Sequence, residues 1–172
     1  LSQVLRANGY YATNNQKQDY QFAPPLTAWD DQSTRASWRG RADGQPFFAI
    51  LNFGITHEGQ VWADRPSPGN LRFHELFEDD PDVRYFEGSE PSQDFPDHVG
   101  SDLVVPVPPY LPDTPLVRQD LRRVYSNIVE LDRQIGIVLK ALEDDGLLED
   151  TTIMFYGDHG GPRPRQKRLL YD

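Results

Sequence analysis

The chain has 172 residues, enough for one domain with a hydrophobic core, and a formal net charge of −10. This acidic balance argues against nucleic acid as a partner, because binding to a phosphate backbone needs a basic surface. No apolar run approaches the length of a membrane span, and the absence of cysteine excludes disulfides. The 15 prolines and 13 glycines predict a compact core with long irregular connections.

The two ends of the sequence carry neither a signal peptide nor a terminating motif. Residues 1–8 are typical of the tail of an amphipathic helix, with Asn8-Gly9 as its stop. Residues 169–172 are largely apolar and contain no stop signal. We therefore expect the chain to be an internal piece of a longer protein.

Two short strands are expected in the first half of the chain. Residues 10–13 predict one strand, a polar loop follows over residues 14–20, and residues 21–46 are expected to be irregular. The run 47–53 is almost continuously apolar, which is typical of a strand buried on both faces of a mostly parallel sheet. It ends just before His57, so this strand would deliver a histidine at its C-terminal end.

A long insertion and a long helix follow. Residues 59–112 are rich in Pro, Asp and Glu, and loops of this length in compact domains usually have a function. Thr114 is a suitable cap and Pro115 a suitable first residue for a helix that runs to about Leu142 and stops at Asp145-Gly146. Its apolar residues recur every three or four positions: Leu121, Val124, Tyr125, Ile128, Leu131, Ile135, Val138, Leu139 and Leu142.

The apolar, β-branched and aromatic run 151–156 predicts a buried strand that ends at Gly157. The order strand, excursion, helix, strand predicts an α/β fold with a mostly parallel central sheet flanked by helices. Asp158 and His159 would then lie outside the carboxyl end of a strand, where ligands bind in such folds. Adjacent carboxylate and imidazole groups suit a divalent cation. The alternative is a turn aspartate that caps the next segment, beside a surface histidine.

Other polar residues are ambiguous when each is taken alone. A strand-end histidine such as His57 either acts on a ligand or is a hydrogen-bonded structural residue, and a lysine in a polar loop, such as Lys17, is usually only solvated. A basic cluster in this acidic chain would draw an anionic substrate to the Asp158 region, or is a solvated loop. The cluster comprises Arg163, Arg165, Lys167 and Arg168.

Taken together and in order, five short motifs resemble the sulfatase family of the alkaline-phosphatase superfamily. They are Gly9-Tyr10 with Lys17, Phe47-Phe48 with Thr56-His57, a helix with Asp132, Gly157-Asp158-His159-Gly160, and Lys167-Arg168 with Tyr171-Asp172. The resemblance covers essentially the whole chain. It implies an alkaline-phosphatase-like α/β fold, incomplete here, with residues 1–172 forming part of one catalytic domain.

The resemblance also implies roles for residues that would handle the sulfate group. Lys17 and Lys167 match lysines that contact the sulfate, and Arg168 adjoins the second of them. His57 matches a histidine that contacts the sulfate ester and is a candidate proton donor to the leaving oxygen. Two lysines and a cation would stabilise the negative charge that develops on the oxygens during cleavage.

Asp158 and His159 match two ligands of the family's divalent cation, which is usually calcium. Oxygen ligands suit calcium, whereas the imidazole of His159 leaves room for manganese or zinc. One position departs from the family pattern. Where sulfatases commonly have a histidine two residues after the first lysine, this chain has Asp19, and a carboxylate there would repel sulfate unless it is paired.

Sulfatases use a formylglycine made from Cys or Ser in a Cys/Ser-x-Pro-x-Arg motif. The chain has no Cys, and Ser89-Glu90-Pro91-Ser92-Gln93 does not qualify, because glutamine replaces the essential arginine and the segment follows His57. The formylglycine and a pair of acidic ligands are therefore expected upstream of Leu1. On this interpretation the 172 residues alone would have no sulfatase turnover.

The resemblance implies a sulfuric ester hydrolase that acts on sulfate esters or sulfamates of a sulfated small molecule or a glycan. The chain is similar to bacterial glycan sulfatases and N-sulfoglucosamine sulfohydrolases, and the family default is a periplasmic or extracellular location. Two alternatives stay open. One is a phosphodiesterase or phosphonate hydrolase of the same superfamily, and the other is a non-catalytic relative that binds sulfated glycans.

Overall fold

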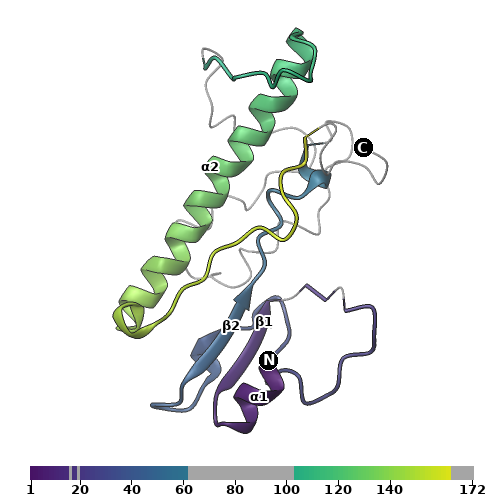
Figure 1. Ribbon diagram of the computed structural model, residues 1–172. Coiled ribbons are helices and arrows are strands. Elements are labelled where there is room, and N and C mark those ends of the chain that lie inside the picture. Colours follow the sequence, from purple (N-terminus) through teal and green to yellow (C-terminus); the bar gives the residue numbers. More distant parts are fainter. Residues whose placement is uncertain (16, 19, 62–102, 164–172) are drawn as a thin grey trace. The chain divides into compact units, whose positions relative to one another are not determined.

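The computed structural model describes residues 1–15, 17–18, 20–61 and 103–163 (Figure 1). These residues belong to two compact units, which we describe separately. The first unit contains the described residues up to Phe53. The second contains residues 54–61 and 103–163. Most of the predicted insertion 59–112, together with Asp19, Lys167 and Arg168, lies outside the described residues.

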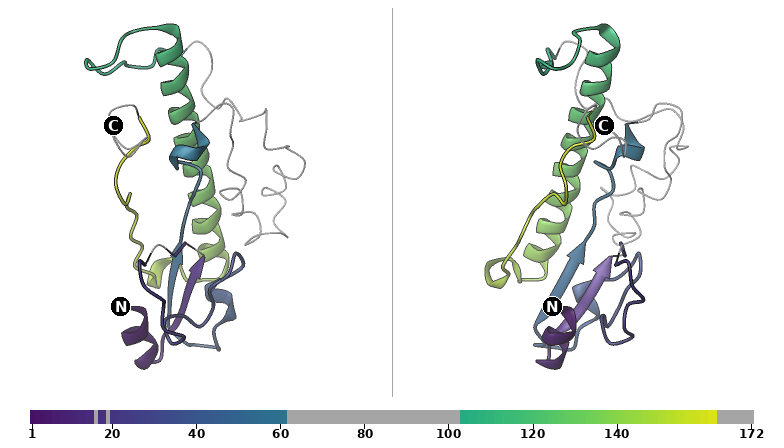
Figure 2. Two further views of the ribbon diagram at one scale, coloured as in Figure 1. Left: turned by 90° about the vertical axis from the view of Figure 1, so that its right-hand side faces the viewer. Right: turned by 45° about the vertical axis from the view of Figure 1, so that its right-hand side comes forward.

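The first unit is built on two parallel strands, β1 (Tyr11–Asn15) and β2 (Phe47–Leu51). Their register pairs Tyr11 with Phe47 and Asn15 with Leu51, and the strands lie side by side in both views of Figure 2. Parallel strands need a long connection, which residues 16–46 supply. This pairing confirms the predicted α/β class, although β1 extends two residues into the segment that we expected to be a loop.

Aromatic residues stack on both faces of β2. Phe47 and Phe48 are neighbours in a strand, so their side chains point to opposite faces. Trp38, which is 1% exposed, stacks on Phe47 with ring centroids 6.0 Å apart, and Trp29 stacks on Phe48 at 6.0 Å. All five residues of β2 are nevertheless half-buried, short of the complete burial that their apolar pattern predicted.

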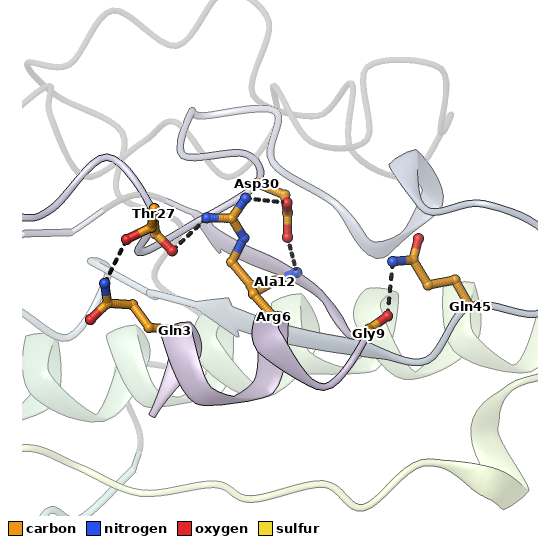
Figure 3. A network of polar contacts seen from close by, with 7 residues as sticks. All are labelled: Gln3, Arg6, Gly9, Ala12, Thr27, Asp30 and Gln45. Carbon is orange, nitrogen blue, oxygen red and sulfur yellow. Dashed lines mark hydrogen bonds and ion pairs between the residues drawn. The ribbon is translucent and has the colours of Figure 1, made fainter.

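The short helix α1 (Ser2–Ala7) is tied by polar contacts to the segment before residue 31 (Figure 3). Gln3 Nε2 donates to Thr27 Oγ1 at 2.6 Å, and Arg6 donates to the Thr27 carbonyl and to Asp30 Oδ1, the latter at 2.7 Å. The other oxygen of Asp30 accepts the Ala12 N–H of β1 at 2.8 Å. The carboxylate therefore joins α1 to the strand.

Asp30 should make the stability of the first unit depend on pH. Burial acts to raise the pKa of this carboxyl, but the hydrogen bonds from Arg6 and Ala12 and the charge of Arg6 outweigh it and lower the pKa. A lowered pKa contributes stability above the unfolded value of about 3.9 and loses it as the pH falls through the folded value. The pair is about a quarter exposed, which weakens it by solvent screening.

We expect Asp30→Asn to reduce the free energy of unfolding by about 1 kcal/mol at pH 7, because a hydrogen bond to a charged partner is lost. The difference from the wild type should be smaller at about pH 3, because this pH lies below the unfolded value of about 3.9, where the stability that comes from the lowered pKa is being lost. Denaturant unfolding at both pH values measures it. If Asp30→Asn lowered the free energy of unfolding equally at the two pH values, the stabilising role given to the ionised Asp30 carboxylate would be wrong.

The second unit is dominated by α2 (Pro115–Asp144), the long helix of Figure 1. Thr114 Oγ1 accepts the Val117 N–H at 3.3 Å, and Pro115 occupies the first turn, as predicted. The helix ends two residues beyond the predicted Leu142, and Gly146 turns the chain with a φ of 68° that glycine adopts readily. Both termini thus follow the signals in the sequence.

The buried face of α2 differs from the predicted apolar stripe in its middle. Leu121, Val124, Val138 and Leu142 are buried as expected, but Ile128 is 45% exposed. Polar residues are buried instead, namely Ser126, Asn127, Glu130 and Gln134. Glu130 is satisfied there, because the guanidinium of Arg133 and the amide of Gln134 donate to its carboxylate, each at 2.9 Å.

The predicted strand over residues 151–156 is not formed. After Gly146 the chain reverses and runs back along the direction of α2 (Figures 1 and 2), and in the described residues no strand pairs with this segment. Ile153, Met154, Phe155 and Tyr156 are 50–79% exposed. A continuous apolar run becomes a buried strand only where neighbouring strands and covering helices supply pairing and burial, and the described residues supply neither here.

In the described residues, no helix combines the length and the apolar character that crossing a membrane requires.

Candidate functional site

Lys17 follows the carboxyl end of β1, and its backbone is held by a buried asparagine. The side chain of Lys17 is exposed, whereas Asn14 is 2% exposed. Asn14 Nδ2 donates to the Lys17 carbonyl at 3.0 Å, and Asn14 Oδ1 accepts from Asn52 Nδ2 at 3.1 Å. Asn52 follows the end of β2, so the ends of both parallel strands converge on the lysine segment.

His57 follows β2 in sequence and belongs to the second unit. Its Nδ1 accepts the Gly59 N–H at 3.1 Å and so caps the 3-10 helix Glu58–Gln60. A ring nitrogen that accepts carries no proton, so in the neutral imidazole the proton is on Nε2. Nε2 lies 3.2 Å from Glu58 Oε2. The Gly59 N–H thus fixes the tautomer of the neutral ring and leaves Nε2–H as the hydrogen-bond donor of a half-exposed side chain.

The segment after His57 is anchored to α2. Gln60 and Val61 are 1% and 4% exposed, and the Val61 carbonyl accepts from Arg123 Nη1 at 2.9 Å. A second arginine of the helix, Arg118, donates to the Val105 carbonyl at 3.2 Å. The bond from Arg123 ties the segment that follows His57 to α2, and the bond from Arg118 ties residue 105 to the same helix.

Asp158 and His159 lie in an exposed bend after residues 151–156. His159 Nε2 is 3.5 Å from Asp158 Oδ2, and the exposed fractions of the two side chains are 39% and 65%. Gly160 has a φ of 98°, which a residue with a side chain rarely adopts, so the chain turns directly after the pair. The carboxylate and the imidazole therefore lie close together, and both side chains are exposed to solvent.

The pair offers one oxygen-bearing and one nitrogen-bearing ligand for a divalent cation. The carboxylate suits calcium and the imidazole suits manganese or zinc, but calcium takes six to eight ligands and structural zinc four. Within residues 1–61 and 103–163, Gln16 and Asp19 excepted, no three metal-binding side chains gather. Asp158 and His159 therefore offer two donor groups, fewer than either coordination number.

The predicted site residues are thus divided between the two units. Lys17 belongs to the first unit, whereas His57, Asp158 and His159 belong to the second. Lys167 and Arg168 lie outside the described residues. The structure brings together Asp158 with His159, and Lys17 with a polar network at the end of its sheet.

Asn14, the buried asparagine that supports Lys17, was not predicted from the sequence. Residues 14–20 were predicted to be a polar loop, so Asn14 was not considered as a buried residue. The available signal was the position of two adjacent asparagines between an apolar strand start and the lysine. Asparagine brings both a donor and an acceptor, and such residues are used to fix turns at strand ends.

Comparison with known proteins defines the class of this chain. The sequence model of the sulfatase family matches residues 2–170, which is nearly the whole chain. The chain therefore belongs to the sulfatase family.

Individual relatives support this assignment. An ulvan-active sulfatase of Formosa agariphila is 48% identical over 182 aligned positions, covering 100% of this chain and 30% of that protein. The human N-sulphoglucosamine sulphohydrolase is 41% identical over 69 residues, covering 40% of this chain and 14% of the enzyme. No solved structure gives a significant match. The chain thus spans less than a third of the length of these curated relatives.

Proposed function

We propose that the protein carrying this segment is a sulfuric ester hydrolase that removes sulfate from a carbohydrate. The observation that carries the proposal is the family match over residues 2–170, which includes every position assigned to sulfate handling. The relative matched along the whole chain is an ulvan-active sulfatase, which favours a sulfated polysaccharide as substrate. Such a substrate fits a periplasmic or extracellular location.

In the proposed mechanism, the ammonium groups of Lys17 and Lys167 stabilise negative charge on the sulfate oxygens. This charge grows in the transition state, where preorganised cationic groups are most effective. His57 gives a proton from Nε2 to the leaving oxygen, and for this step the ring has to be an imidazolium, since a neutral imidazole that lost its Nε2 proton would become an imidazolate. In the imidazolium Nδ1 also carries a proton, so it releases the Gly59 N–H that it accepts in the neutral ring.

Asp158 and His159 would hold a divalent cation, calcium first and manganese or zinc as alternatives. When bound, that cation supplies positive charge that stabilises anionic oxygens. We expect the nucleophile, a formylglycine in this family, outside these 172 residues, because the chain has no cysteine. The segment expressed alone should accordingly release no sulfate.

Sulfate release from defined saccharides tests the proposal. The full-length protein is incubated with sulfated ulvan oligosaccharides, an N-sulfated glucosamine saccharide and an aryl phosphodiester, and free sulfate and phosphate products are measured by ion chromatography. We expect sulfate release that falls on chelation and returns with calcium. Cleavage of the phosphodiester without sulfate release would instead support the phosphohydrolase alternative. Saccharide binding without any cleavage would support a non-catalytic relative.

A further inference from the structure

Asn14 contacts three other residues, Lys17 and Tyr20 in the segment that follows it and Asn52 at the end of the second strand. Its Nδ2 donates to the Lys17 carbonyl at 3.0 Å and lies 3.5 Å from Tyr20 Oη, and its Oδ1 accepts from Asn52 at 3.1 Å. The side chain is 2% exposed. Since water cannot replace these partners readily, each bond is costly to lose.

The chemistry of the three partners selects asparagine. A carbonyl such as that of Lys17 only accepts, so the group that faces it must donate, whereas the amide of Asn52 donates and needs an acceptor. One side chain must therefore present a donor on one side and an acceptor on the other. Aspartate has no N–H to donate to the Lys17 carbonyl, and serine is too short to reach both Lys17 and Asn52 at the observed distances.

The same network locks the ends of the two strands. Asn52 N–H and Asn52 Nδ2 both donate to the Asn15 carbonyl, at 2.9 and 3.0 Å. Tyr20 Oη, the other neighbour of Asn14, also accepts from Trp29 Nε1 at 2.9 Å. The backbone of Lys17 is thus held by a network that includes the ends of both strands and the aromatic side chains of Tyr20 and Trp29.

We propose that Asn14 is a positioning residue, which sets the backbone of Lys17 so that its ammonium reaches the sulfate group. The inference rests on the proposed role of Lys17 in sulfate handling. A lysine side chain has four rotatable carbons, so it can be aimed only if its Cα is fixed. Displacement of a catalytic group by about 1 Å is enough to cost about a hundredfold in rate.

Asn15 provides a matched control on the same strand. It is 8% exposed, is the next residue of β1, and therefore points to the opposite face. Its Nδ2 donates to a backbone carbonyl, that of Thr34, instead of that of Lys17. Asn15→Ser thus removes one buried amide-to-carbonyl bond of the same kind without touching the lysine segment.

The test compares Asn14→Ser with Asn15→Ser in the full-length protein. We expect Asn14→Ser to lower kcat for sulfate release about ten- to a hundredfold with a smaller change in KM, since charge stabilisation in the transition state is impaired. Asn15→Ser should keep kcat within about threefold of the wild-type value, while it reduces thermal stability about as much as Asn14→Ser does. Equal kcat values for the two variants at equal stability would overturn the proposal.

A crystal structure of each variant separates failure of this inference from failure of the proposed function. With Asn14→Ser, the Cα of Lys17 should move by about 1 Å or more relative to β1, whereas Asn15→Ser should leave it in place. An unmoved Lys17 in Asn14→Ser overturns the positioning role even if the protein cleaves sulfate esters. If the wild type releases no sulfate from any saccharide, the proposed function fails and the inference about catalysis fails with it.

Discussion

Replacing Lys17 by methionine in the full-length protein is expected to lower kcat for sulfate release by about a hundredfold or more. Methionine keeps a long unbranched stem but removes the ammonium, and loss of one preorganised charge-stabilising group typically has an effect of this size. Thermal stability should change little, because the side chain of Lys17 is exposed. Initial rates of sulfate release over a range of saccharide concentrations give kcat and KM separately.

Lys140 serves as the control for this substitution. It lies near the end of α2, where it contacts Glu143 and Asp144, and it is 61% exposed. Lys140→Met removes the same charge from the protein and should leave kcat within about twofold, because exposed ion pairs contribute little. If both lysine variants were equally active, Lys17 would have no role in sulfate handling.

Trp38→Ala should produce the largest loss of stability in the first unit, about 3–5 kcal/mol of unfolding free energy. The indole is 1% exposed and stacks on Phe47 of β2, and the guanidinium of Arg39 lies over it at 5.9 Å. Alanine would leave a cavity against the strand and remove the stacking contact. Denaturant unfolding of the full-length protein measures this loss as the change in free energy of the transition in which the first unit unfolds.

Two further variants make this prediction specific. Trp38→Phe keeps an aromatic ring against Phe47 and should lose clearly less stability than alanine does. Leu26→Ala removes an apolar side chain that is fully exposed in the described residues and should change stability by less than about 0.5 kcal/mol. Equal stabilities for Trp38→Ala and Leu26→Ala would show that Trp38 is not part of a packed core.

The sequence predicted elements whose signals are local. Thr114, Pro115 and Gly146 bound α2 through capping and turn preferences that act within a few residues, and the structure contains the helix between them. The apolar run that forms β2 and the mostly parallel sheet were likewise expected from composition and from the order of elements, whereas the pairing of β2 with β1 was not predicted. Preferences that act within a few residues were thus sufficient to predict these elements.

The residues that were mispredicted depend on distant partners. Asn14 and Asn15 are polar, yet they are buried in β1 because Lys17, Thr34 and Asn52 satisfy their side chains. Residues 151–156 have the composition of a buried strand, but pairing and burial have to be supplied by other segments. Neither kind of partner can be read from the periodicity of the segment itself.

The candidate site was predicted from family motifs, and the structure adds local geometry to those of its residues that it describes. His57 gains a defined tautomer from the Gly59 N–H, and Asp158 faces His159 at 3.5 Å. Lys17 gains a supporting asparagine that no motif had indicated. The proposed function requires these residues, which belong to two units, to converge on one substrate.

A crystal structure of the full-length protein with inorganic sulfate tests this convergence most directly. We predict one sulfate ion whose oxygens accept hydrogen bonds from Lys17 Nζ and from His57 Nε2, with Asp158 and His159 bound to a cation beside it. A sulfate bound at a site that excludes both Lys17 and His57, with the two residues on separate surfaces of the protein, would contradict it.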